Sequence, residues 1–422
     1  MSERYFQHAF SNGLTLLVEE MPTMQSAGMC LLLAAGAATD PPDAGGSATV
    51  LSDLILRGAG DRDSRQLTDH LDSLGLQRSS SVGVHHLRLF CAAVARNVLD
   101  ALPAYADIVR RATLPAAEFG PARDLALQAL AGIEDEPRQK LSIKLRERHF
   151  GWPLGRPPMG RRQDLERLTV EICRADYLQR FRARGAILSI AGNVRFQPVR
   201  DRVGQLLGDW RSGCDEPVFA CDPAGEVCHE THASEQTHIG IAYPALRETD
   251  EDYYAMQLAI EVLGGGMSGR LFTEIREKRA LVYNVSASYA SLKDCGAILG
   301  YAGTSTDRAQ ATLDTFIAEL LRLCHGVTPA ELERARTGLK AQIVMSEEST
   351  SARASAIAHD FYMRGRVRTL DEIKAAIDAV TLEQVNTFLK NHPPGPFTIV
   401  TLGPRPLAIP AEAASRKPRA GT

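Results

Sequence analysis

The spacing of apolar and polar residues along the chain predicts short strands and amphipathic helices in mixed order. Residues 5–10 and 14–19 are strand-like runs joined at Ser11-Asn-Gly13, which predicts a β-hairpin. The continuous apolar run at 27–35 predicts a buried strand. Apolar residues that recur three and four positions apart predict helices, for example over 96–111. The pattern therefore indicates a globular protein that contains both helices and sheets.

The order of predicted elements begins again after about residue 226, and short sequence words recur with it. The equivalent pairs are Glu118 and Glu331, Thr169 and Thr381, and Gly192 and Gly403, and the offset within each pair is almost the same. A chance similarity would not keep its register over so long a stretch. We therefore predict an α+β fold of two homologous domains, each a mainly antiparallel sheet with helices packed on it.

Composition sets the expected boundaries of these domains. We predict an N-terminal domain over 1–211, a linker over 212–226, a C-terminal domain over 227–404 and a disordered tail over 405–422. The linker contains turn-forming Asp, Pro and Gly residues, and the tail is rich in Pro, Ala and Arg. At 422 residues, the chain is long enough for each domain to bury its own core.

The helix predicted after Gly46 carries Thr49, Ser52 and Asp53 on one face, next to an apolar face. This is the layout of an inverted zinc-peptidase helix, H-x-x-E-H, in which two His bind zinc and the Glu activates water. The surrounding frame G-x-A-H-x-L-E-H-x-x-x-x-G is intact. However, Thr49 stands at the first His, Ser52 at the Glu and Asp53 at the second His.

This helix resembles the active-site helix of the pitrilysin/insulinase family of zinc peptidases. In that family a third ligand, a Glu on a later helix, precedes the Pro of an acidic D-x-P turn, and the resemblance assigns this position to Ala129, ahead of Pro137. Ala129 cannot bind a metal, and Thr49 and Asp53 offer at most two hard oxygens where tetrahedral zinc needs three strong ligands. We therefore expect this chain to bind no zinc and to be inactive as a peptidase alone.

The second half contains Ser268-Gly-Arg-Leu-Phe-Thr-Glu-Ile-Arg276, followed by Tyr283. This segment resembles the family motif S-x-R-L-F-x-x-x-R-E-x-x-G-L-x-Y, whose Arg and Tyr reach the substrate held at the zinc. The resemblance implies that Arg276 and Tyr283 bind substrate, because a guanidinium can donate two hydrogen bonds to a peptide carbonyl and a phenol can donate one to an oxyanion. Ala280 stands where the family usually has Gly, which we expect to be a minor change.

Two structural alternatives apply to this pair. Arg276 would instead form a salt bridge with Glu274 or Glu277, and Tyr283 would be a half-buried strand residue. Their occurrence together in a matching repeat favours the functional interpretation.

The resemblance extends over about residues 5–403 and implies a family member that works as a dimer. The chain resembles the non-catalytic subunit of a heterodimeric zinc peptidase, with a division of labour similar to that of mitochondrial processing peptidase. Zinc is expected in the homologous partner subunit, while this chain contributes Arg276 and Tyr283, and the substrates are expected to be unfolded peptides. The alternatives are a structural scaffold subunit, a peptide-binding homodimer without hydrolysis, and an enzyme that acts alone.

Charge and hydropathy narrow the choice of partners and compartment. The formal net charge of −3 gives no reason to expect binding to nucleic acid or to an anionic membrane. The N-terminus lacks the basic and apolar regions of a secretory signal, and the apolar run 29–36 is too short to span a bilayer. We therefore expect a cytoplasmic location, with a periplasmic one left open.

Overall fold

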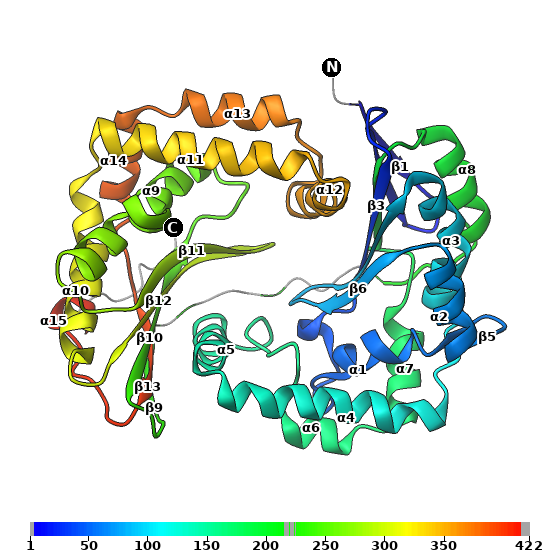
Figure 1. Ribbon diagram of the computed structural model, residues 1–422, viewed down its shortest axis with the longest axis horizontal. Helices are drawn as coiled ribbons and strands as arrows, with labels where there is room; N and C mark the ends of the chain where they lie inside the picture. The colour runs from blue at the N-terminus through cyan, green and yellow to red at the C-terminus, as the bar shows by residue number, and fades with distance from the viewer. Residues whose placement is uncertain (1–3, 215–218, 220–222, 224, 415–422) are drawn as a thin grey trace. The chain divides into compact units, whose positions relative to one another are not determined.

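The computed structural model describes residues 4–214, 219, 223 and 225–414. The chain forms two compact units, each with its own sheet and helices (Figure 1). The first unit comprises Met1–Gly132, Arg156–Val218 and Met345–Thr369, and the second comprises Ile133–Gly155, Phe219–Val344 and Leu370–Thr422. The predicted fold class, two α+β domains with mainly antiparallel sheets, is confirmed.

The units are discontinuous in sequence, unlike the domains predicted over 1–211 and 227–404, because each half contributes a helix to the other unit. Of the predicted linker 212–226, residues 215–218, 220–222 and 224 lie outside the described part of the chain.

The first unit contains a six-stranded sheet in the order β1-β2-β8-β3-β7-β6. Its strands are β1 (Arg4–Ala9), β2 (Thr15–Glu20), β3 (Ser26–Leu33), β6 (Gln77–Val82), β7 (Leu87–Val94) and β8 (Ile187–Gly192). All neighbours pair antiparallel except β2 and β8, which run parallel with Thr15 opposite Ile187. A small ladder joins β4 (Gly58–Ala59) to β5 (Arg62–Asp63).

Helices cover both faces of this sheet. They are α1 (Ser47–Leu54), α2 (Ser64–Ser73), α3 (Ala95–Arg110), α4 (Ala116–Gly132), α6 (Arg162–Arg167), α7 (Val170–Arg180), α8 (Phe196–Leu207) and α12 (Thr350–Arg364), with a 3₁₀ turn η1 at Ala37–Thr39. The main core lies between one face and the helices of the first half, and it includes the fully buried Val50, Leu51 and Leu54 of α1. A smaller core joins the other face to α12.

Within its described residues, the second unit repeats this sheet for five of the six strands, and no counterpart of β1 is among them. Its strands are β9 (Val227–Thr231), β10 (Gln236–Ala245), β11 (Asn284–Leu292), β12 (Cys295–Ser305) and β13 (Thr398–Gly403). Their order, β11-β12-β10-β13-β9, is the first unit's order β6-β7-β3-β8-β2 with each strand replaced by its equivalent. Even the single parallel pair recurs, between β13 and β9. The repeat predicted from sequence words is therefore a repeat of topology.

The helices of the second unit pack around its own core. They are α5 (Pro137–Phe150), α9 (Tyr253–Gly264), α10 (Ala309–Arg322), α11 (Pro329–Glu347), α13 (Leu370–Ala379), α14 (Leu382–Asn391) and α15 (Ala411–Ala414), with shorter turns η2 (Ile133–Asp135), η3 (Gly266–Ser268), η4 (Phe272–Glu277) and η5 (Leu323–His325). The core includes the fully buried Phe316 of α10.

Equivalent helices are exchanged between the halves. Helix α12 comes from the C-terminal half, yet it packs on β3 and β8 of the first unit (orange in Figure 1). Helix α5 comes from the N-terminal half, yet it packs on β10 and β13 of the second unit. Leu141 and Leu145 of α5 bury against Ala242 and Val400 there. Neither sheet is therefore covered on both faces by its own half of the sequence.

The predicted disorder of the tail 405–422 does not hold for residues 405–414. Ala408 exchanges two hydrogen bonds with the Gln310 side chain of α10, at 2.8 and 2.9 Å, and Ala413 is buried in the second core. The apolar residues Leu407 and Ile409 explain this, because both pack against the same core. Residues 415–422 lie outside the described chain.

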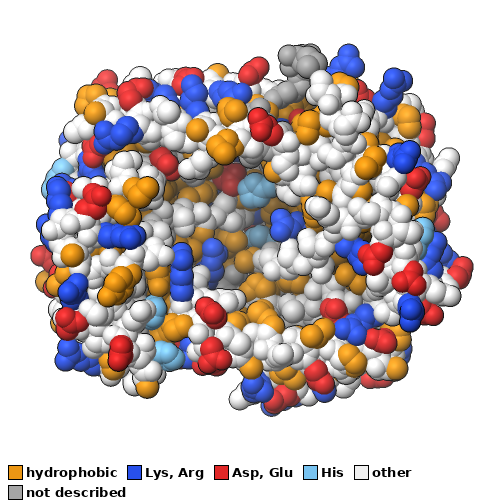
Figure 2. Space-filling model, viewed as in Figure 1, with side chains coloured by type: hydrophobic (Ala, Val, Ile, Leu, Met, Phe, Trp, Pro, Cys, Tyr) orange, Lys and Arg blue, Asp and Glu red, His pale blue; other side chains and the backbone are white. Residues whose placement is uncertain are grey.

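The surface carries charges of both signs, as the small net charge leads one to expect. On the face shown in Figure 2, basic and acidic side chains are interspersed, with apolar side chains between them. None of the described helices is long and apolar enough to cross a membrane.

Candidate functional site

A buried ion network fixes the start of α1, the helix that carries the zinc-peptidase frame. The Asp40 carboxylate accepts hydrogen bonds from the backbone N–H groups of Gly46 (2.7 Å) and Ala48 (3.0 Å), which satisfies donors that the helix itself leaves open. The Arg180 guanidinium pairs with Asp40 at 3.0 Å and also with Asp176. Burial raises the pKa of Asp40, and the Arg180 charge opposes that rise. The frame is therefore rigidly held, although its chemistry has been substituted.

The three polar residues of the frame have partners within the chain. Thr49 donates from Oγ1 to the carbonyl of Pro158 at 2.6 Å, and Ser52 donates to the carbonyl of Thr49 at 2.8 Å. The Asp53 carboxylate accepts from Arg57 Nε at 2.5 Å. These bonds use the groups that would otherwise face a ligand.

The residues at the frame do not fit a zinc ion. Ala129 lies on α4, which packs against α1, and its methyl side chain is exposed and cannot coordinate. Asp53 is neutralised by Arg57, which also pairs with Glu118 at 2.7 Å. Among the described residues, no group of three or more His, Cys, Asp or Glu side chains could hold a metal. The arrangement lacks the three strong ligands that zinc requires.

Arg276, in contrast, lies in a short π-helical segment and remains accessible. The segment η4 spans Phe272–Glu277, and π-helices are rare elements that occur often at functional sites. The Arg276 guanidinium lies 4.8 Å from the centre of the Phe272 ring, a cation–π arrangement. Within the described residues it makes no hydrogen bond or ion pair, so neither Glu274 nor Glu277 takes the role that the structural alternative assigned to it.

Tyr283 stands directly before β11, and its side chain is 71% exposed. Its backbone N–H donates to the Gly303 carbonyl of β12 at 3.1 Å, which fixes where the side chain leaves the sheet. The hydroxyl has no hydrogen-bond partner in the described part of the chain. The half-buried alternative therefore does not describe this residue, and both members of the pair present open donors in the same unit.

Ala280, between the two residues, adopts a left-handed backbone with φ of 49°. Its N–H donates to the Arg276 carbonyl at 3.1 Å, and the next N–H, that of Leu281, donates to Ile275 at 3.0 Å. This is the hydrogen-bond pattern of a helix end that normally has Gly at the left-handed position. Ala at this position adopts a backbone conformation that costs Ala more than it would cost Gly, and the expectation that the replacement is minor stays a prediction.

An Arg–Glu pair that the sequence analysis missed occurs once in each repeat. Arg57 bonds Glu118 at 2.7 Å in the first unit, and Arg270 bonds Glu331 at 2.7 Å in the second, with the same sequence separation in both. Arg270 holds the pKa of Glu331 at about 2. The sequence analysis had already paired Glu118 with Glu331. Comparing the two repeats further toward their N-terminal ends would also have paired Arg57 with Arg270.

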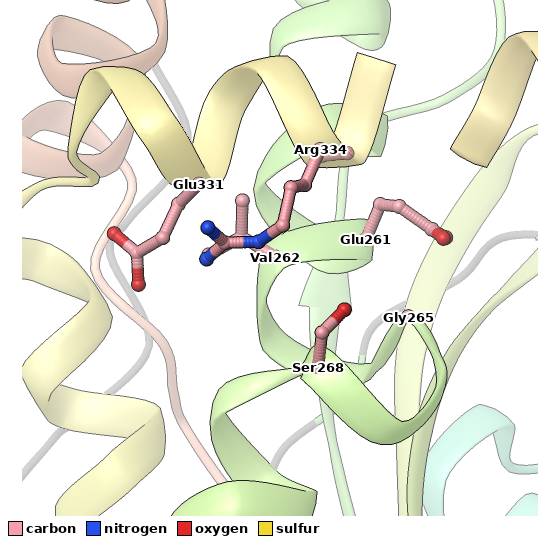
Figure 3. A pocket seen from close by; sticks show the side chains of 7 residues that line it. Glu261, Val262, Gly265, Ser268, Glu331 and Arg334 are labelled. Atoms are coloured by element: carbon pink, nitrogen blue, oxygen red, sulfur yellow. The ribbon is translucent and has the colours of Figure 1, made fainter. Parts of the chain in front are cut away.

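A small cavity lies at the equivalent of the zinc frame in the second repeat. It is lined by Glu261, Val262, Gly265, Ser268, Glu331, Arg334 and Ala335 (Figure 3). Val262 and Gly265 correspond to Thr49 and Ser52 at the same offset that relates Glu331 to Glu118, so the counterparts of these two positions carry no metal-binding groups either. The cavity volume is about 20 Å³, which holds about one water molecule and no peptide.

The fold and the frame together define a two-repeat relative of zinc peptidases. Family models described as insulinase (peptidase family M16) and as peptidase M16 inactive domain match residues 15–160 and 167–339, respectively. The chain belongs to this peptidase family, M16.

Three relatives illustrate how far the likeness extends. The protein named uncharacterized zinc protease YmxG of Bacillus subtilis is 25% identical over 387 residues, covering 90% of this chain and 93% of that protein. The structure of a peptidase M16 inactive domain from Pseudomonas fluorescens has a TM-score of 0.86 at 20% identity, covering 96% of this chain and 99% of that one. A chain in the structure of complex III2 from Candida albicans has a TM-score of 0.81 at 16% identity, covering 94% of this chain and 95% of that one. The two structural likenesses show the fold alone.

Proposed function

We propose that this chain is the non-catalytic subunit of a heterodimeric zinc metallopeptidase. Its partner is a homologous subunit with an intact H-x-x-E-H helix, whose zinc supplies the hydrolytic chemistry. This chain supplies Arg276 and Tyr283, which bind the substrate peptide and stabilise the transition state. The substrates are unfolded peptides, whose backbone carbonyls are accessible to such donors.

One contrast carries this proposal. The frame residues Thr49, Ser52 and Asp53 are bonded within the chain, whereas Arg276 and Tyr283 have exposed side chains with open donors. An unpaired guanidinium and an unpaired phenol are the groups that a peptide carbonyl and an oxyanion would recognise.

The test is to reconstitute the chain with a homologous subunit that carries the H-x-x-E-H helix and to measure cleavage of an unfolded peptide. We expect Tyr283→Phe to lower kcat of the complex by about 10²–10³, the range for loss of a donor to an oxyanion. Arg276→Ala removes charge-assisted hydrogen bonds to a substrate carbonyl and should lower kcat/KM by about 10- to 100-fold. Assembly, measured by size-exclusion chromatography, should not change.

The matched control is Arg247→Ala. Arg247 lies in the same unit and is 52% exposed, but it is paired with Asp250 at 2.8 Å. We expect its replacement to leave turnover unchanged.

The alternative functions give different results in the same assay. If both substitutions leave turnover unchanged in an assembled, active complex, the chain is a scaffold and the proposal is wrong. If the purified chain alone contains one zinc per chain and cleaves peptide, it is an enzyme by itself. If it binds peptide as a homodimer but no partner gives cleavage, it is a peptide-binding protein.

A further inference from the structure

Three basic side chains around Arg276 converge on one carboxylate. Glu274, whose side chain is only 14% exposed, accepts from Lys278 Nζ at 2.8 Å and from Arg279 at 3.1 Å. Arg322 of α10, which pairs with Glu319 at 2.7 Å, also approaches the Glu274 carboxylate at 3.5 Å. The hydrogen bond from Lys278 is the largest cause of a lowered pKa at Glu274, so this group stays ionised at neutral pH. Glu274 thus contacts three cations, none of which is Arg276.

Arg276 does not pair with Glu274, because the two side chains point to different faces of the segment. Residues two positions apart on a helix do not face each other, so Glu274 cannot readily pair with Arg276. Lys278 follows Glu274 by four residues and shares its face. Arg276 follows Phe272 by four residues and lies over that ring instead. The segment therefore has an ion-paired face and a cation–π face, and only the second leaves a cation available.

The cluster also ties down the turn between Arg276 and Tyr283. Arg279 donates both to the Glu274 side chain and to its backbone carbonyl, the latter at 2.7 Å. These bonds fold the end of the π-helical segment back on itself immediately before Ala280, the residue in the strained left-handed conformation. The path from one substrate-facing residue to the other therefore passes through contacts made to Glu274.

We propose that Glu274 is a positioning residue that holds Arg276 and Tyr283 in their productive arrangement. This inference rests on the proposed function. Without the carboxylate, the charges of Lys278 and Arg279 would be uncompensated, Arg322 would keep only Glu319, and the turn would lose its anchor. Each of these ion pairs is weak when a partner is exposed, so the effect requires the three cations to act on one carboxylate as a network.

The experiment is a double-mutant cycle in the reconstituted complex with Glu274→Gln and Arg276→Ala, with rates normalised to the concentration of assembled complex. We expect Glu274→Gln to lower kcat/KM by roughly three- to tenfold, the lower part of the range for residues coupled in one network, and mainly through kcat. In the Arg276→Ala background the same substitution should have a much smaller effect. A purely structural role would reduce the amount of complex but not the rate per complex.

A second variant guards against misfolding of Glu274→Gln. Arg279→Gln changes a side chain that is 46% exposed and should give a smaller loss of the same sign, which again nearly disappears when Arg276 is absent. Glu333→Gln is the control, because Glu333 is an exposed, ion-paired acid on α11, and we expect no change in rate.

The outcomes separate this inference from the proposed function. If Arg276→Ala itself leaves the rate unchanged, the proposed function fails. If Arg276→Ala lowers the rate but Glu274→Gln has no effect, or an equal effect in both backgrounds, only the positioning role of Glu274 is overturned.

Discussion

The two repeats share one topology but differ in whether the polar side chains discussed above are bonded within the chain or exposed. In the first unit, Asp40, Asp176 and Arg180 form a buried network, and the residues of the zinc frame bond to their own chain. In the second unit, the side chains of Arg276 and Tyr283 are exposed and keep open donors within the described residues. The frame of the first repeat is thus held in place without three metal-binding side chains, whereas the second repeat presents two accessible donors.

The exchanged helices show the same difference. Arg353 of α12 pairs with Glu19 of β2 at 3.0 Å, and both side chains are 5% exposed. Its counterpart in the first repeat of the sequence is Lys140 of α5, which pairs with Glu230 of β9 at 2.6 Å, where Glu230 is 32% exposed. The ion pair occurs in both units, but both of its side chains are buried only in the first unit. At this pair of positions, the ion pair of the first unit is therefore more completely buried than its counterpart in the second.

The largest expected effect separates these two ion pairs. Arg353→Ala removes the guanidinium that pairs with the buried Glu19 carboxylate and should lower the free energy of unfolding by about 3–5 kcal/mol. Lys140→Ala should cost only about 1 kcal/mol, because water can reach Glu230. Chemical denaturation of the two variants measures both values.

The control for the first pair replaces both charges with apolar residues. Arg353→Met combined with Glu19→Leu should recover most of the loss, since no unpaired charge remains. If Arg353→Ala and Lys140→Ala lowered the free energy of unfolding equally, the different burial of the two ion pairs would have no effect on stability.

A buried histidine makes the second unit sensitive to acid. His149 of α5 is 1% exposed and bonds Thr398 at 3.0 Å, and burial lowers its pKa from 6.5 to about 4. The unfolded chain binds this proton first as pH falls, so stability is complete above pH 6.5 and is lost toward pH 4, by about 3 kcal/mol. The equivalent position on α12, at the offset that relates Arg353 to Lys140, is Tyr362 and not a histidine.

Unfolding free energies measured from pH 7 to pH 4 test this asymmetry. In His149→Gln, the loss of unfolding free energy between pH 7 and pH 4 should be smaller by about 3 kcal/mol than in the original chain. In Tyr362→Phe, this loss should be unchanged. An unchanged slope in His149→Gln would assign the acid sensitivity to other groups.

The repeat, the substituted frame and the Arg276/Tyr283 segment could be predicted because each depends on local spacing in the sequence. The exchange of α5 and α12 could not, because an amphipathic helix is equally compatible with either sheet. Strand β9 (Val227–Thr231) was missed because it follows a turn-rich linker and has few apolar residues. The bond from Thr49 to Pro158 joins segments far apart in the chain, and no pattern in the sequence indicates it.

The smallest expected effect uses one substitution at two positions, one in each repeat. Ala280→Gly should stabilise the protein by about 0.5–1 kcal/mol, since Gly adopts the left-handed conformation without strain and this gain exceeds its loss of chain entropy. Ala129→Gly, on the exposed face of α4, should instead destabilise by about 1 kcal/mol, because Gly is a poor residue for a helix interior. Denaturation midpoints give both signs. If Ala280→Gly also destabilised, the turn before Tyr283 would not be strained, and Ala would be as suitable there as Gly.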